Sequence, residues 1–228
     1  RHTGTQAHRH TGTQAHSYTH RETRRHTYRK AALVHINSCR PDSGVTRDAL
    51  ARIQPCFECR IKRGTSVRAA DAALYHGPWG RMSATERGHC LRRLGDLLAA
   101  NCETLGAVET IDTGKMFKET RWQAKYIADY LHFYAGAADK VSGETLPIDK
   151  PDMFVFTERE PLGVIAAIVP WNSQLFLSAV KIGPELAAGN TIVLKASEHA
   201  SAPLLEFGAL IAEAGIPDGV VNIITGHG

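Results

Sequence analysis

Several features that would place the chain in a membrane or outside the cell are missing from its 228 residues. A membrane-spanning helix requires about 20 consecutive apolar residues, and the sequence has no such run. The N-terminus also lacks the charged-then-apolar pattern of a secretory signal peptide. Five cysteines, an odd number in a chain without such a signal, indicate reduced thiols. These absences predict a cytoplasmic protein without membrane contact.

Cysteine pairs that could bind a metal are also scarce. Cys56-Phe-Glu-Cys59 has the spacing of a zinc or redox pair, but no second pair follows at the spacing of a zinc ribbon. Cys90 and Cys102 lie in a helical pattern, where cysteine is usually a small packing residue. We therefore expect no metal site.

Apolar residues at helical or strand spacing are sparse in residues 1–68, which begin with two copies of the octapeptide Arg-His-Thr-Gly-Thr-Gln-Ala-His. This segment has 14 Lys and Arg against 4 Asp and Glu, whereas residues 69–228 have 13 against 19. Because too few apolar side chains are available for a core, it is predicted to be a disordered, low-complexity basic tail, or the product of a faulty gene model. A metal-binding or nucleic-acid-binding arm is the alternative. Nucleic acid is disfavoured because histidine is mostly neutral at pH 7.

Residues 69–228 have the periodicities of a folded domain. Ser83-Ala-Thr-Glu86 is a capping box, which marks the start of a helix. Its apolar face continues at three- and four-residue steps through Leu91, Leu94, Leu98, Cys102 and Leu105. Thr113-Gly114-Lys115 interrupts this pattern, and a second helix is predicted from about Lys118. Trp122, Tyr126, Tyr130, Leu131 and Tyr134 lie on or beside its buried face.

A glycine- and proline-containing connection, residues 141–151, separates these helices from the rest of the chain. The segment 153–160 that follows has strand propensity and carries charges toward its end, so it is predicted to be an exposed strand. A surface hairpin or pairing with another subunit would each satisfy its backbone groups, and both remain open.

The apolar run Leu162–Val169 is uncharged, rich in β-branched residues and too short for a buried helix, which predicts a strand covered on both faces. Two further short strands are predicted at Thr191–Lys195 and Val220–Thr225, with helical segments between the strands. Strands that alternate with helices form parallel sheets with right-handed crossovers. The predicted fold class is α/β, a partial Rossmann-like parallel βαβαβ sheet preceded by two helices and an exposed β-hairpin or oligomerisation strand.

Polar groups follow all three predicted strands: Trp171-Asn172, Lys195-Ala-Ser-Glu198 and Gly226–Gly228. In a parallel sheet these segments lie along one edge, where open α/β sheets bind their ligands. An amide, an ammonium group, a carboxylate and a glycine-rich turn would line one crevice, which suits a nucleotide. The usual G-x-G-x-x-G fingerprint follows none of the strands.

Several ordered motifs resemble the aldehyde dehydrogenase superfamily. They are Glu160-Pro-Leu-Gly-Val164, Val169-Pro-Trp-Asn172, Lys181–Asn190, Val193–Glu198 and Gly215–Gly226. Weaker similarity reaches back through Asp112-Thr-Gly-Lys115 to about Ala70, and residues 1–65 show no counterpart. On this resemblance, residues 69–228 are a truncated NAD-binding domain of an aldehyde dehydrogenase.

The resemblance also implies roles for individual residues. Asn172 matches the side-chain amide that donates to the developing oxyanion of the aldehyde. The matched cofactor-binding residues are Ile168, Val169 and Trp171 beside the nicotinamide, Lys195 and Glu198 at the adenosine ribose, and Gly228 near the adenine. Because a carboxylate at the ribose repels a 2′-phosphate, NAD is the expected cofactor, although Lys195 leaves NADP open.

The family's nucleophilic cysteine and general-base glutamate match no residue of the sequence. The expected reaction is oxidation of an aldehyde to a carboxylic acid with NAD(P)+. The chain alone is expected to be inactive, because an oxyanion donor needs a nucleophile to create the oxyanion. The alternative is a non-catalytic fragment that binds nucleotide or a sister subunit. The expected partners are an aldehyde and, in the full-length protein, further copies of the chain.

Overall fold

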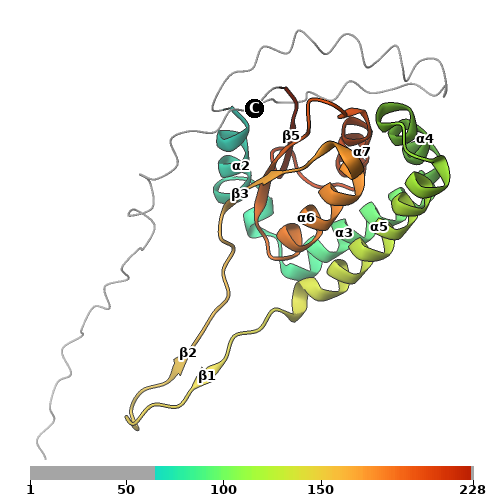
Figure 1. The fold of residues 1–228 in the computed structure, drawn as a ribbon. Helices are drawn as coiled ribbons and strands as arrows, with labels where there is room; N and C mark the ends of the chain where they lie inside the picture. Colours follow the sequence, from blue (N-terminus) through green and yellow to red (C-terminus); the bar gives the residue numbers. More distant parts are fainter. Residues whose placement is uncertain (1–64, 227–228) are drawn as a thin grey trace, which may run out of the picture. The chain divides into compact units, whose positions relative to one another are not determined.

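The computed structural model describes residues 65–226 (Figure 1). Its elements are α2 (Thr65–Tyr75), η2 (Trp79–Arg81), α3 (Ala84–Ala100), α4 (Cys102–Thr113), α5 (Phe117–Ala137), η3 (Ala138–Lys140), β1 (Thr145–Leu146), β2 (Val155–Phe156), β3 (Val164–Ile168), η4 (Trp171–Ser173), α6 (Gln174–Ala187), β4 (Thr191–Lys195), α7 (Ala202–Glu213) and β5 (Val221–Ile224), where η denotes a 3-10 helix. The predicted tail, residues 1–68, lies outside the described range except for its last four residues, which begin α2. The Cys56–Cys59 motif also lies outside it.

Helix α3 begins as the capping box predicts. The Glu86 amide donates to Ser83 Oγ at 3.3 Å, and the Ser83 amide donates to the Glu86 carboxylate at 2.7 Å. The apolar pattern that continues to Leu105 is divided between two helices, because the chain breaks at Asn101. The Asn101 side chain donates to the Leu97 carbonyl at 2.8 Å, a local bond that competes with helix continuation.

Glycine and alanine residues let α5 and α3 approach each other closely. A Cβ atom added at Gly88 of α3 would lie 2.6 Å from the Ala135 carbonyl oxygen, so the two backbones approach closely. On α5, the buried residues include Ala124, Ala128 and Ala135 together with Ile127 and Leu131. The large rings of Trp122 and Tyr126 are exposed, and Tyr126 stacks on Trp122 and on Phe176 of α6.

The predicted α/β class and the parallel βαβαβ order are confirmed. β3, β4 and β5 form one parallel sheet in the order β3-β4-β5, with β4 in the middle. Thr191 of β4 donates through its hydroxyl to the Ala70 carbonyl of α2 at 3.1 Å. Ile192, on the opposite face by strand alternation, is buried in the core, and α6 packs against β4. Helices therefore cover both faces of β4.

β3 corrects one expectation, because it is an edge strand whose two faces differ. Ala167 and the following Val169 are buried, whereas Ala166 is exposed and Ile168 is 76% exposed. The apolar run predicted to be covered on both faces is thus open on the face of Ala166 and Ile168. An uninterrupted apolar run shows that both faces avoid charge, but it does not show that both are covered within residues 65–226.

β1 and β2 form an antiparallel pair in which Thr145 lies opposite Phe156 and Leu146 opposite Val155. The predicted exposed hairpin is confirmed, and pairing with another subunit stays a prediction. Leu146, Phe154 and Phe156 are exposed on it. Figure 1 shows the hairpin between the end of α5 and the start of β3.

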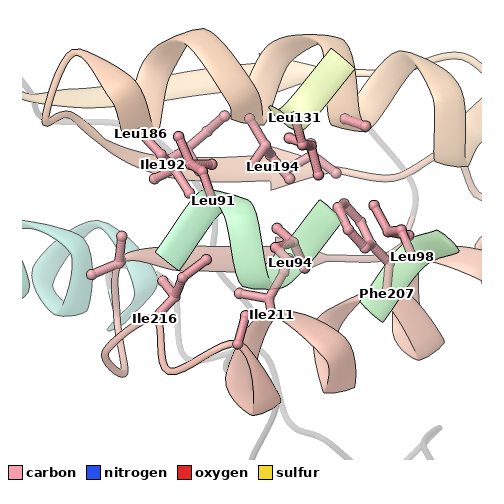
Figure 2. Close-up of a cluster of buried hydrophobic side chains, with 14 of the residues drawn as sticks. Leu91, Leu94, Leu98, Leu131, Leu186, Ile192, Leu194, Phe207, Ile211 and Ile216 are labelled. Carbon is pink, nitrogen blue, oxygen red and sulfur yellow. The ribbon is translucent and has the colours of Figure 1, made fainter. Parts of the chain in front are cut away.

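One hydrophobic core joins the helices to the sheet (Figure 2). Its side chains include Leu91, Leu94, Leu98, Leu131, Leu186, Ile192, Leu194, Phe207, Ile211 and Ile216, all buried. Helix α3, which carries three of these leucines, packs against both α6 and α7, the helices that connect the strands of the sheet. This packing holds α6, which begins at Gln174, in place. Among residues 65–226, no helix has both the length and the apolar character needed to cross a membrane.

Candidate functional site

The structure brings the carboxyl ends of the three strands together. In the sheet register, Ile168 is paired with Lys195, and Lys195 with Ile224. The Val169 amide donates to the Lys195 carbonyl at 3.1 Å, and the Ala196 amide to the Ile224 carbonyl at 2.8 Å. Paired residues of neighbouring strands direct their side chains to one face. Ile168 and Lys195 therefore lie on the same face at the same edge.

Asn172 lies in η4, the short turn between β3 and α6. Asn172 is exposed, and the Trp171 beside it is 51% exposed. Ile168 is also open to solvent, so these three residues are accessible to a ligand. Val169 is only 2% exposed and belongs to the core. Of the residues matched to the nicotinamide side, the structure exposes Ile168 and Trp171 but not Val169.

Lys195 and Glu198 form an ion pair at the end of β4. The ammonium nitrogen lies 3.7 Å from the Glu198 carboxylate and donates to the Ala196 carbonyl at 2.7 Å. Both side chains are partly exposed, and a bridge between Ser197 and Ala200 folds the segment back on itself. The site thus presents one donor group and one acceptor group together, an arrangement that can bind adjacent hydroxyl groups. Gly228 lies outside the described residues.

A residue with no role assigned from the sequence, Lys115, contacts the Asn172 turn. It lies between α4 and α5, and its ammonium group donates to Ser173 Oγ at 2.8 Å. The same group donates to Gln123 Oε1 at 3.1 Å and pairs with Glu119 at 2.8 Å. Lys115 and Ser173 are 58 positions apart, so no local spacing could have indicated this contact.

A second residue that the sequence analysis missed, Glu109 of α4, is fully buried near the start of α6. Burial raises the pKa of its carboxyl group, and nearby Lys115 and the backbone amides of Leu175 and Gln174 oppose that shift only in part. Within residues 65–226, neither carboxyl oxygen makes a hydrogen bond of normal geometry, and the buried side-chain amide of Gln174 has no partner either. A buried polar cluster therefore lies under the turn that carries Asn172.

Comparison with known proteins decides the family. Residues 36–228 match the model of the aldehyde dehydrogenase family. The chain belongs to this family. The match begins before the expected limit near Ala70, so residues 36–65, which were expected to have no counterpart, do have one. The sequence motifs that carried the resemblance lie later in the chain, and this earlier part was too weakly patterned to show it.

Relatives and solved structures agree with this assignment. A (Z)-2-((N-methylformamido)methylene)-5-hydroxybutyrolactone dehydrogenase from Acinetobacter baylyi is 58% identical over 163 residues, which cover 72% of this chain and 33% of that protein. Omega-crystallin from Enteroctopus dofleini is 37% identical over 209 residues, covering 87% of this chain and 42% of that protein. A Bacillus cereus aldehyde dehydrogenase solved as an NAD+ complex aligns with a TM-score of 0.70 at 39% identity, over 72% of this chain and 33% of that one. This aldehyde dehydrogenase family member thus spans between a third and a half of the relatives it matches.

Proposed function

We propose that this chain supplies the coenzyme-binding edge and the oxyanion donor of an aldehyde dehydrogenase that oxidises an aldehyde to a carboxylic acid with NAD+. The observation that carries the proposal is the alignment of Ile168, Lys195 and Ile224 across the sheet, which joins the segments ending in Asn172 and Glu198. Similarity to NAD-dependent family members supports it.

The described residues fit a dinucleotide. Ile168 and Trp171 offer exposed apolar surface for a nicotinamide ring, and the Lys195–Glu198 pair offers a donor and an acceptor for ribose hydroxyls. The carboxylate would repel a 2′-phosphate, which favours NAD over NADP. When bound, NAD+ accepts the hydride that leaves the aldehyde carbon. Val169, whose side chain belongs to the core, and Gly228 remain proposed cofactor-binding residues, Val169 on the nicotinamide side and Gly228 near the adenine.

Asn172 acts on the aldehyde oxygen. Addition of a nucleophile to the carbonyl carbon places negative charge on that oxygen, and the Asn172 side-chain amide can donate a hydrogen bond to it. One such donor contributes about 2.7–4 kcal/mol to transition-state stabilisation in other enzymes. Cys90 is buried and bonded by Arg93 at 3.2 Å, so it is unsuited to attack a substrate at this edge. The proposed reaction therefore uses the family's cysteine and glutamate, which match no residue of this sequence.

The exposed hairpin supports assembly with further copies of the chain. β1 and β2 have solvent-exposed apolar side chains, including Phe154 and Phe156, which a sister subunit would cover. Cys90 and Cys102 form no disulfide within residues 65–226, which suits a cytoplasmic location, where cysteines stay reduced. A non-catalytic fragment that pairs with a sister subunit is the second candidate, and the same hairpin favours it.

Calorimetric titration of the purified chain with NAD+ tests the proposal. We expect binding that weakens at least tenfold in Lys195→Ala and stays unchanged in Lys118→Ala, which alters an exposed lysine of α5. With an aldehyde added, the chain alone should form no NADH. Absence of NAD+ binding in a folded sample would remove the coenzyme proposal and leave only the subunit-pairing candidate. Sequencing the transcript across the Gly228 codon then shows whether the cysteine and glutamate follow.

A further inference from the structure

We propose that Lys115 is a positioning residue for Asn172, because its ammonium group anchors Ser173 and thereby fixes the turn that directs the Asn172 amide. This inference rests on the proposed function, in which Asn172 donates to the aldehyde oxygen. Among residues 65–226 the Lys115 ammonium group has Ser173, Gln123 and Glu119 as partners, so it acts on Asn172 through the turn.

The contacts of Lys115 account for its whole hydrogen-bonding capacity. An ammonium group has three donors, and Lys115 has three partners at 2.8–3.1 Å: Ser173, Gln123 and Glu119. Gln123 donates in turn to Glu119 at 3.3 Å, so Lys115, Glu119 and Gln123 are each bonded to the other two. The lysine side chain is 15% exposed, which limits competition from water. Ser173 is therefore held by a directed, charge-assisted bond.

The backbone on both sides of this bond is also fixed. On the lysine side, Gly114 ends α4 with φ +75°, and the Lys115 amide donates to Thr113 Oγ1 at 3.4 Å. On the other side, Ser173 directly precedes α6, whose first turn is packed in the core through Leu175. Asn172 itself is exposed within the turn, so the bond at Ser173 limits the directions its amide can take.

A simpler role for Lys115 would be an ion pair with Glu119 in the first turn of α5. Exposed pairs of this kind between residues four apart contribute little to stability. The pair with Glu119 alone, however, requires neither the low exposure of Lys115 nor its bond to a residue 58 positions away. The two roles differ in one observable, the environment of Asn172.

The side-chain amide signals of asparagine test the proposal in the intact 228-residue chain. A sample labelled with 15N at asparagine contains five such residues, and Asn172→Ala identifies the signal of Asn172. Asn190 and Asn222 are buried and bonded, so their signals report whether the fold is retained. Lys115→Met removes the donors and keeps most of the side-chain length, whereas Lys115→Arg keeps the charge and the donors.

We expect Lys115→Met to shift and broaden the Asn172 signals while those of Asn190 and Asn222 stay in place. Lys115→Arg should restore the Asn172 signals, and Lys118→Met, a change to an exposed lysine three residues away, should leave them unaltered. Ser173→Ala removes the acceptor from the turn and should reproduce the effect of Lys115→Met.

Unchanged Asn172 signals in Ser173→Ala and in folded Lys115→Met would overturn the proposal. If the signals of Asn190 and Asn222 disappear in the Lys115→Met variant, that variant has unfolded. The result for Ser173→Ala then decides the positioning proposal by itself. NAD+ titration of the same samples separates the two proposals. If the wild-type chain does not bind NAD+, the coenzyme function is contradicted. If the Asn172 signals do not change in Lys115→Met, only the positioning role is contradicted.

Discussion

The Tyr130 hydroxyl of α5 donates a hydrogen bond of 3.1 Å to the backbone carbonyl of Val180 in α6. Val180 needs this donor because Pro184, four residues later, has no N–H to offer. A helix with an internal proline usually leaves such a carbonyl to solvent, and here a neighbouring helix supplies the missing bond. Burial raises the pKa of Tyr130 to about 12, so the hydroxyl keeps its proton at physiological pH.

Removing that hydroxyl should destabilise the domain, and restoring the helical N–H should compensate. Tyr130→Phe leaves Val180 without its donor, which is expected to lower the free energy of unfolding by about 1 kcal/mol. In a Pro184→Ala background the helix supplies its own donor, so the same change should cost less. Urea unfolding of the two single variants and the double variant measures the coupling, and equal costs in both backgrounds would contradict this account.

The buried carboxyl group of Glu109 should make stability depend on pH. Because burial raises its pKa in the folded state, the folded chain binds more protons than the unfolded chain above the ordinary value of 4.5. The free energy of unfolding therefore falls as the pH rises from that value through the raised pKa. Glu109→Gln should flatten this dependence and raise stability at pH 7 by about 1–3 kcal/mol. Glu103→Gln, an exposed change on the same helix, is the control in urea unfolding at several pH values.

Glu198 should control the choice between the two nicotinamide cofactors. Glu198→Gln removes the negative charge that repels a 2′-phosphate but leaves an acceptor for the 2′-hydroxyl. We expect NADP+ affinity to rise by about tenfold, or 1.4 kcal/mol, while NAD+ affinity changes less. Calorimetry with both cofactors measures the ratio, and an unchanged ratio would show that Glu198 does not lie at the ribose.

Trp79 should be essential to the link between α6 and β4. Its indole N–H lies 3.2 Å from the Gly189 carbonyl and 3.0 Å from that of Asn190, and the ring is completely buried. Trp79→Phe is expected to cost about 2–4 kcal/mol, because it removes the donor and leaves a cavity. Trp122→Phe, a change to a ring that is 59% exposed, should cost far less in the same unfolding experiment.

Features that depend on residues close together in the sequence could be predicted, and features that depend on residues far apart in the sequence could not. The Ser83–Glu86 capping box and the helix-ending Gly114 act within a few residues, and the structure has both as expected. The parallel arrangement of the strands and their shared edge followed from the alternation of short apolar strands with helices. The break at Asn101 was missed because leucine spacing continues across it.

The remainder depends on tertiary contacts. The exposure of Ile168 depends on which strands lie beside β3, and the sequence of β3 does not contain that information. Lys115 and Glu109 approach the Asn172 turn only because α4, α5 and α6 pack together. Residues of this kind have no motif of their own, so only the folded chain shows them near the site.

The open face of β3 is a surface that a nucleotide and a second protein chain could each contact. It carries the exposed Ile168 on the same side as Lys195, and within residues 65–226 β3 has a neighbouring strand on one side only. A nucleotide bound at the carboxyl ends of the strands would cover the Ile168 side chain, and we expect it to shield apolar surface that a second chain could otherwise contact. The protein without bound nucleotide would then associate with itself more readily than the protein with nucleotide bound.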